Sequence, residues 1–231
     1  MSSPIIGGLN EKSLHRQLKE YYRTTDSKIE QVVSGYVVDV VSSNELIEIQ
    51  TANFSAMRNK LAVLLTEHRV RLVYPVAAET TISVFEEDGI LRSSRKSPKK
   101  GCLSSAAGEL LYLAELLPHP NLTVEVLLVK QEEVRRADGK GSWRRRGVSI
   151  EDRMLCEVLQ SRLFAETSDY LALLPVSLPS IFGNREIAGK LTGMNKRGKL
   201  RLAGQITYLL RKLGLIEITD KEGNRLLFTA C

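Results

Sequence analysis

Apolar residues recur along the chain with two different spacings, and each spacing predicts a type of secondary structure. Alternating or continuous apolar runs, typical of strands, occur at 29–33, 71–76 and 80–85, in a hairpin over 36–51, and in a longer segment at 122–134. Apolar residues spaced three and four apart, typical of helices, occur at 10–22, 54–67, 104–117, 150–163 and 167–174. This order of elements predicts a mixed α/β fold in which helices flank a sheet.

The last quarter of the chain has its own pattern, set off by the two prolines of LPVSLPS near 175–180. A short helix is expected at 185–191, then a turn, then a longer helix from about Lys196 or Lys199 to Leu213, closed by Gly214. A hairpin follows, with strands at 215–219 and 225–229. We therefore predict two domains, residues 1–175 and residues 176–231.

The composition is that of a soluble globular protein, with 43% hydrophobic and 26% charged residues among 231. No apolar run approaches the roughly 20 residues that span a bilayer, and the first residues lack a signal-peptide pattern. The three cysteines (Cys102, Cys156 and Cys231) are far apart and show no zinc spacing. We expect a cytoplasmic protein without a membrane partner.

The positive charge is concentrated at one end of the chain. Residues 180–231 contain ten Lys/Arg and four Asp/Glu, which accounts for the whole net charge of +6. Two further stretches, 91–101 and 137–147, are basic and rich in turn formers, so we predict exposed loops there. Concentrated positive charge favours a polyanion, nucleic acid first, although a solubilising surface would give the same composition.

The hairpin YVVDVVSSNELIEIQT, residues 36–51, carries acids inside apolar strands. A tight turn at Ser43-Asn44 would place Val41 opposite Leu46, Val40 opposite Ile47 and Asp39 opposite Glu48. Gln50 lies two residues after Glu48 and so shares its face. Opposed buried carboxylates need neutralisation, and a divalent cation such as Mg²⁺ provides it. A slipped register or an exposed edge would instead leave both acids solvated.

Two further residues could complete such a site. Glu11 lies on the apolar stripe of the first helix, so it can point toward the sheet, or it can simply favour the helix macrodipole. Lys60, on the helix after the hairpin, is the best-placed cation, although a solvated lysine would look the same. His15, His68 and His119 show no ligand spacing and are read as structural or surface residues.

An acid-bearing helix, a hairpin with Asp and then Glu-x-Lys, and a following helix resemble the PD-(D/E)XK, or restriction-endonuclease-like, nuclease superfamily. The resemblance covers residues 10–76. It implies that Asp39, Glu48 and the Ile49 carbonyl hold Mg²⁺ or Mn²⁺, which polarises a phosphodiester and activates water. Gln50 replaces the superfamily's Lys. Either Lys60 substitutes for it, or catalysis is weakened or lost.

The C-terminal order of helix, turn, helix and hairpin resembles a winged helix-turn-helix, whose second helix enters the DNA major groove. The resemblance implies that DNA is contacted by Lys196, Arg197, Lys199 and Arg201 at the start of that helix, and by Arg225 on the wing. Trp143 with Arg144, Arg145 and Arg146 could add contacts by stacking on bases or straddling phosphates, or Trp143 could simply anchor an exposed loop. A winged helix used only for protein contacts is the alternative.

These resemblances together predict a Mg²⁺- or Mn²⁺-dependent endonuclease that a winged helix docks on duplex DNA. Two cuts on a duplex would suit a homodimer. Two alternatives remain open at this stage. One is a non-catalytic DNA-binding regulator with an inactive nuclease-like domain, and the other is an adaptor within a mobile-element or defence complex.

Overall fold

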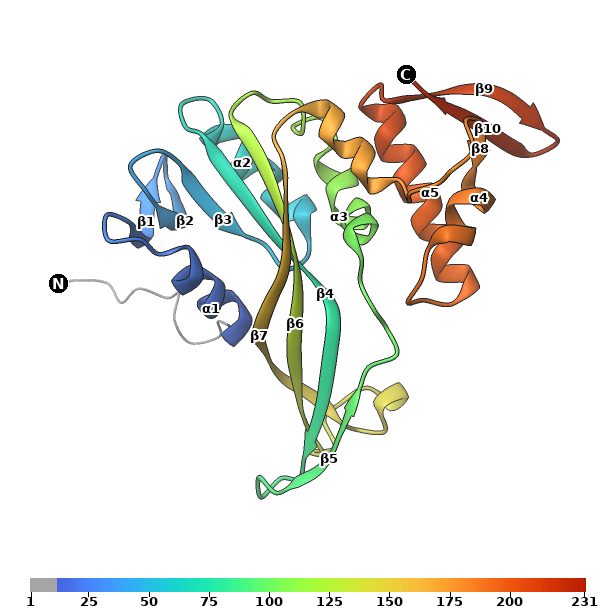
Figure 1. Cartoon of the computed structure of the whole chain (residues 1–231). Helices are drawn as coiled ribbons and strands as arrows, with labels where there is room; N and C mark the ends of the chain where they lie inside the picture. The colour runs from blue at the N-terminus through green and yellow to red at the C-terminus, as the bar shows by residue number, and fades with distance from the viewer. Residues whose placement is uncertain (1–11) are drawn as a thin grey trace.

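The computed structural model, which describes residues 12–231, has a mixed α/β fold with a central sheet between helices (Figure 1). Six strands follow one another across the sheet in the order β1 (Lys28–Val33), β2 (Tyr36–Val41), β3 (Leu46–Ile49), β4 (Val70–Phe85), β6 (Leu122–Arg136) and β7 (Ser149–Phe164). Strand β5 (Leu91–Lys96) pairs with β4 off this path. Strands β3, β4 and β6 are parallel neighbours, and the other pairs are antiparallel.

Helices cover both faces of the sheet. Helix α1 (Ser13–Tyr22) lies on one face, where Leu14 and Leu18 pack in a core with Val40, Ile47 and Val73. The other face is covered by η1 (Phe54–Met57), α2 (Arg58–Leu64), η2 (Leu103–Ala106), α3 (Ala107–Leu110) and η3 (Leu111–Leu113). None of the described helices is long and apolar enough to cross a membrane.

The strands β4, β6 and β7 run past the helices and form an arm that carries β5 and the short η4 (Trp143–Arg145) at its lower end (Figure 1). The two strands expected at 71–76 and 80–85 are one strand, β4, which continues through Pro75. Proline is tolerated there because the ladder with β3 ends at Val73, so that side of β4 needs no N–H from residue 75.

The helix expected at 150–163 is wrong, because these residues belong to the long strand β7. Three register shifts occur along the pairing of β7 with β6, and they leave Glu151, Cys156 and Leu159 unpaired. Each extra residue reverses the inward and outward alternation of the strand. The apolar residues of β7 therefore lose their period of two and imitate helical spacing. The second expected helix, 167–174, is the 3₁₀ segment η5 (Thr167–Leu173).

Two other expectations need correction. Residues 91–96 are not a loop but the strand β5, whose six side chains are all exposed beside β4. The helix expected at 104–117 is a broken run of 3₁₀ and α turns that ends at Leu113. The expected strand at 122–134 and the expected helix at 54–67 have counterparts in β6 and in η1 with α2.

The C-terminal part contains β8 (Phe182–Gly183), α4 (Asn184–Lys190), α5 (Lys196–Lys212), β9 (Ile216–Glu222) and β10 (Arg225–Ala230). Asn195 begins α5 by accepting a hydrogen bond from the Gly198 amide at 2.8 Å. The three strands form a separate small sheet in the order β8-β10-β9. Helix α5 packs against α3, and its buried residues belong to the same hydrophobic core as those of α2 and α3.

Candidate functional site

Asp39 lies where β2 and β3 separate. The expected pairs Val41–Leu46 and Val40–Ile47 are confirmed, but the expected pair Asp39–Glu48 is not formed, because the paired register ends at Val40–Ile47. The Asp39 carboxylate instead accepts a hydrogen bond from the Ile49 amide at 2.8 Å. The same oxygen, Oδ2, lies 3.1 Å from Nε2 of His15 on α1. Asp39 thus joins the first helix to the end of β3.

Glu48 is buried within β3, with only 2% of its surface exposed. Alternation along the strand puts it on the same face as Leu46, toward α2. Its carboxylate oxygen Oε1 lies 2.6 Å from Nζ of Lys60, which also donates to the Val37 carbonyl at 2.5 Å. This short contact neutralises the Glu48 carboxylate, so a cation that binds at Oε1 would compete with Lys60.

The pKa values of the two carboxyl groups are shifted in opposite directions. Burial raises the pKa of Glu48 to about 7, and the nearby Asp39 charge adds to this rise, while Lys60 opposes it. Burial also acts to raise the pKa of Asp39, but the hydrogen bond and charge of His15, the Ile49 amide and Lys60 outweigh burial and lower that pKa below its ordinary value. One carboxyl of the pair is therefore held ionised, and the other can carry a proton near neutral pH.

Gln50 does not contact either acid through a described hydrogen bond. Its side-chain amide donates to the Ala52 carbonyl, and its backbone N–H donates to the Val73 carbonyl at 2.9 Å. The side chain thus stabilises the loop that leads from β3 to η1. The positive charge beside Glu48 is the ammonium of Lys60 on α2. Lys60 is the residue that the sequence suggested as a substitute for the lysine that Gln50 replaces.

His15 is the site residue that sequence reasoning missed, because the three histidines were examined only for spacing relative to one another. A signal was present: His15, Leu18 and Tyr22 lie three and seven residues apart and share a helical face, which packs on the sheet. Glu11, the third acid expected at the site, lies outside the described residues.

The donors around this pair suit a hard divalent cation. Carboxylate and carbonyl oxygens are the ligands that Mg²⁺ takes in proteins, usually one or two carboxylates with waters and substrate oxygens. Asp39, Glu48 and the carbonyl of Ile49, whose amide donates to Asp39, would be the ligands of such an ion. Among residues 12–231, no cluster of three or more acidic, His or Cys side chains is arranged to hold a metal. The fit therefore rests on two carboxylates, and a cation would have to displace Lys60 or share Glu48 with it.

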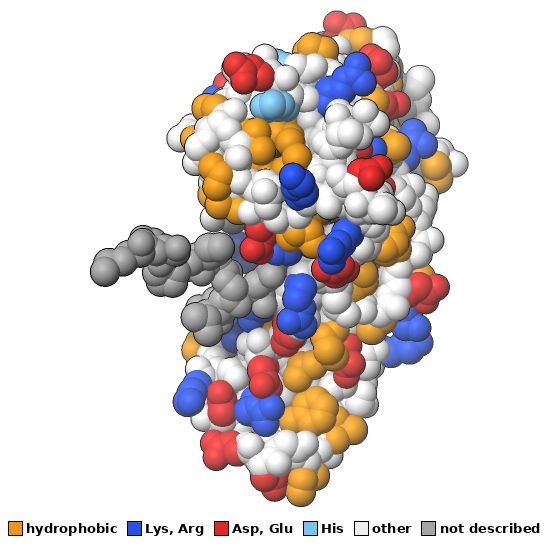
Figure 2. Space-filling view, turned by 90° about the vertical axis from the view of Figure 1, so that its left-hand side faces the viewer, with side chains coloured by type: hydrophobic (Ala, Val, Ile, Leu, Met, Phe, Trp, Pro, Cys, Tyr) orange, Lys and Arg blue, Asp and Glu red, His pale blue; other side chains and the backbone are white. Residues whose placement is uncertain are grey.

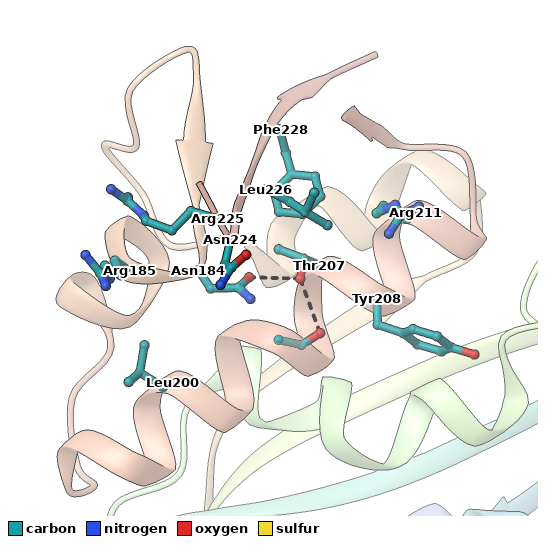
Figure 3. Close-up of a pocket in the computed structure, with 11 residues that line it drawn as sticks. Asn184, Arg185, Leu200, Thr207, Tyr208, Arg211, Asn224, Arg225, Leu226 and Phe228 are labelled. Atoms are coloured by element: carbon teal, nitrogen blue, oxygen red, sulfur yellow. Dashed lines mark hydrogen bonds between the residues drawn. The ribbon is translucent and has the colours of Figure 1, made fainter. Parts of the chain in front are cut away.

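The exposed face of α5 forms a second candidate surface. At 100° per residue, Arg197, Arg201, Gly204, Tyr208 and Arg211 fall within one arc of the helix. Lys196 lies about 60° outside this arc, and Lys199 projects from the other side. Gly204, Tyr208 and Arg211 of the arc line an open pocket of about 420 Å³ (Figure 3).

The pocket lies between α4, α5 and β10 (Figure 3). The hydroxyl of Thr207 fixes its floor, donating to the Asn184 side chain at 3.0 Å and to the Gly204 carbonyl at 3.2 Å. Arg185 and Arg211 contribute to its lining without a described ion pair, so it presents donors to any anion that enters.

The remaining expected DNA contacts lie elsewhere or are already paired. The Arg225 guanidinium donates to Glu186 at 2.8 Å and to Glu222 at 3.1 Å. Arg144 stacks on Trp143, with its guanidinium carbon 5.5 Å from the ring centroid, at the far end of the arm from α5 (Figure 1). Arg145 donates to the Val148 carbonyl at 3.1 Å. Trp143 itself is 82% exposed.

Charge is not segregated on every face. Figure 2 shows the side of the molecule that carries α1, where Lys and Arg side chains are interspersed with Asp and Glu. Among the described residues, Lys19 pairs with Glu30 at 2.6 Å and Arg71 with Glu45 at 2.6 Å. On the described part of the face in Figure 2, the mixed charges do not form an extended positive surface.

Similarity to known proteins covers most of this chain. A family model described as "Domain of unknown function (DUF8091)" matches residues 12–165, which include the whole central sheet and the Asp39–Glu48 site. A protein of Treponema pallidum (strain Nichols), described as "Uncharacterized protein", is 33% identical over 224 residues, covering 96% of this chain and 86% of that protein. No solved structure gives a significant match.

Proposed function

The chain belongs to the family described as "Domain of unknown function (DUF8091)", and from its geometry we propose that it is a divalent-metal-dependent endonuclease acting on duplex DNA. The proposal includes a restriction-endonuclease-like arrangement of residues 12–175 and a winged helix at the C-terminus. With its three free cysteines, a reducing cytoplasm would suit it.

One observation carries the proposal: two carboxylates and a lysine from three different elements converge where β2 and β3 part. Nζ of Lys60 lies 2.6 Å from the Glu48 carboxylate, and Asp39 accepts from the amide that follows Glu48. This supports Lys60 as the replacement for the Lys that the PD-(D/E)XK pattern places at position 50. An ammonium acts as a point charge, so it can serve the same site from another element if its Nζ reaches the same place.

In this proposal, Asp39, Glu48 and the Ile49 carbonyl hold Mg²⁺ or Mn²⁺. When bound, the ion polarises the phosphodiester and lowers the pKa of an attacking water. Lys60 stabilises negative charge that develops on the phosphate. His15 positions Asp39, because its Nε2 is 3.1 Å from the carboxylate oxygen that also accepts the Ile49 amide.

The C-terminal part supports the DNA-docking half of the proposal. Helices α4 and α5, a two-residue strand β8 and the β9–β10 hairpin are combined in the order that a winged helix requires. The first turn of α5 holds cations and no acid, although a positive charge there opposes the helix macrodipole. Such an unfavourable arrangement is understandable if phosphates contact this end of the helix.

A second function is favoured by a specific observation. Both carboxylates already have basic partners from the protein itself, the His15 imidazole for Asp39 and the Lys60 ammonium for Glu48. A site that neutralises itself can persist as a structural element without any metal. The second candidate is therefore a non-catalytic DNA-binding regulator in which the ion pairs only stabilise the sheet.

A plasmid cleavage assay tests the proposal. We expect the wild-type chain to nick or linearise supercoiled plasmid in Mg²⁺ or Mn²⁺ and to be inactive in EDTA. Asp39→Ala should abolish cleavage, whereas Asp26→Ala, which removes an exposed acid from the turn after α1, should leave it unchanged. An inert wild type with an active Gln50→Lys variant would favour the regulator, and an Asp39→Ala variant that cuts normally would refute the site.

A further inference from the structure

The stretch from residue 89 to residue 108 contains no acidic residue. It includes five cations, Arg92, Arg95, Lys96, Lys99 and Lys100, and all five side chains are exposed. Among them, only Arg92 forms an ion pair with another described residue, Glu86 at 3.6 Å. These residues line β5 and the segment that leads from β5 toward α3, on the side of the arm nearest the C-terminal part (Figure 1).

The segment after β5 is held in place from both sides. The Ser97 amide donates to the Thr80 carbonyl at 2.8 Å, and the Gly101 amide donates to the Ala77 carbonyl at 2.8 Å, so both ends are anchored to β4. Between them, the Lys100 amide donates to the Gly193 carbonyl at 3.2 Å, in the turn between α4 and α5. The backbone carrying Lys99 and Lys100 is therefore fixed against the turn that begins α5.

Gly193 makes this close approach possible. Its φ of +73° is one that other residues rarely adopt, and a Cβ added to it would lie 2.4 Å from the Lys100 carbonyl oxygen. Lys196 follows three residues later. The cations of the arm and those at the start of α5 thus belong to one connected surface, which we call the basic strip: Arg92, Arg95, Lys96, Lys99, Lys100, Lys196 and Arg197.

The composition of the strip distinguishes a nucleic acid from a protein partner. Between Arg92 and Lys100 the other residues are three serines and one proline, with no large apolar side chain to anchor a protein interface. Lys, Arg and Ser side chains are the common donors to phosphate oxygens. Nine residues of extended chain and one turn of helix reach at most about 35 Å, which is about one turn of B-DNA.

We propose that the basic strip binds the sugar-phosphate backbone of duplex DNA and extends the contact made by α5 along the arm. This inference rests on the DNA-docking half of the proposed function and not on its metal chemistry. The arm then holds the duplex over a longer stretch, independent of base sequence. This role does not depend on chemistry at the carboxylate site.

Fluorescence anisotropy with labelled duplexes in EDTA tests the strip without cleavage. The variant Arg95→Ala with Lys96→Ala removes one cation from each side of β5, so its effect does not depend on which side the DNA contacts. We expect about five- to tenfold weaker binding of a duplex of about 20 base pairs, with the slope of log affinity against log salt reduced by about 1 to 2. The matched control, Lys28→Ala with Arg69→Ala, removes two exposed cations outside the strip and should change affinity less than about twofold.

Duplex length provides a second measurement. The wild type should bind the longer duplex more tightly than one of about 8 base pairs, and the β5 variant should lose most of that gain. A Gly193→Ala variant that remains folded by circular dichroism should show the same loss, because it separates the arm segment from α5.

The outcomes distinguish this inference from the proposed function. If Arg197→Ala with Arg201→Ala weakens binding and the β5 variant does not, the strip is refuted and docking by α5 stands. If neither variant affects binding, DNA docking itself fails. Tighter binding of duplex RNA than of duplex DNA would overturn the choice of ligand, and no binding of any nucleic acid would leave the strip to a protein partner and refute the inference.

Discussion

The Asp39–Glu48 site and the exposed face of α5 use charge in opposite ways. At the first, each acid lies beside a basic side chain from a neighbouring helix: Nε2 of His15 is 3.1 Å from Asp39, and Nζ of Lys60 is 2.6 Å from Glu48. On α5, Arg197 and Arg201 are exposed, and neither forms an ion pair with a described residue. In the first region the acids have partners within the protein, whereas in the second the arginines are exposed without a described ion pair.

This difference determines whether a ligand must compete with side chains that already pair with the site. A metal ion that binds Asp39 and Glu48 must displace or share existing counter-ions, so its net gain is smaller than its attraction to two bare carboxylates. A phosphate that approaches α5 meets cations that lose only water and loosely held counter-ions. Changes at the first region should therefore alter chemistry and stability together, whereas changes at the second should alter binding alone.

The largest effect is expected from Lys60→Met, which keeps the length of the side chain but removes its charge. The cleavage rate should fall about 10²- to 10³-fold, because a preorganised cation beside the phosphate is lost. DNA affinity in EDTA should stay within about twofold, since Lys60 is not on the α5 surface. The plasmid assay and anisotropy measure the two quantities separately.

The conservative variant Lys60→Arg serves as the control and should retain part of the activity. If Lys60→Met cuts as fast as the wild type, the lysine has only a structural role, and another cation must act at the site. Equal losses of cleavage and DNA affinity would show that the two regions are not independent.

The next effect concerns stability and pH, through the raised pKa of Glu48. Its ordinary value is 4.5 and burial raises it to about 7, so the folded state holds this proton more tightly than the unfolded state. The stabilisation that results is fully present below about pH 4.5 and is lost as the pH rises through 7. Gln cannot ionise, so Glu48→Gln should gain stability relative to the wild type over this range, by on the order of 3 kcal/mol.

Urea unfolding of the metal-free proteins at several pH values measures this difference. His15 and Asp39 titrate in both proteins, so subtracting one curve from the other isolates Glu48. A difference that stays constant between pH 4.5 and pH 8 would mean that Glu48 is ionised throughout, with Lys60 fully compensating it.

The sequence predicted those parts of the site that depend on local geometry. The turn at Ser43-Asn44 sets the register of the hairpin within a few residues, and the pairs Val41–Leu46 and Val40–Ile47 are as expected. What depends on packing between distant elements was harder to predict. His15 reaches Asp39 only because α1 lies across the sheet at one particular angle, and no spacing along the chain reports that angle.

The long strand β7 shows a second limit. Its three bulges disturb the alternation that identifies a strand, and the pairing with β6 that stabilises it comes from a segment earlier in the chain. Sequence periodicity describes an element by itself, whereas β7 is a strand because of its neighbour. The C-terminal helices and hairpin were easier to place, because capping residues such as Asn195 and turns such as Gly223-Asn224 are local signals.

The smallest expected effect tests whether paired and unpaired cations on the same unit differ. Arg197→Ala with Arg201→Ala should weaken duplex binding about tenfold and lower the salt slope by about 2, because two cations without partners are removed. Arg225→Ala should change affinity less than about twofold, since that guanidinium is already neutralised by Glu186 and Glu222. It should instead lower the free energy of unfolding by about 0.5–1 kcal/mol, the value typical of partly exposed ion pairs. If Arg225→Ala weakens binding as much as the double variant, its ion pairs open when DNA binds, and the charge pairing seen in the free protein does not identify which cations contact the duplex.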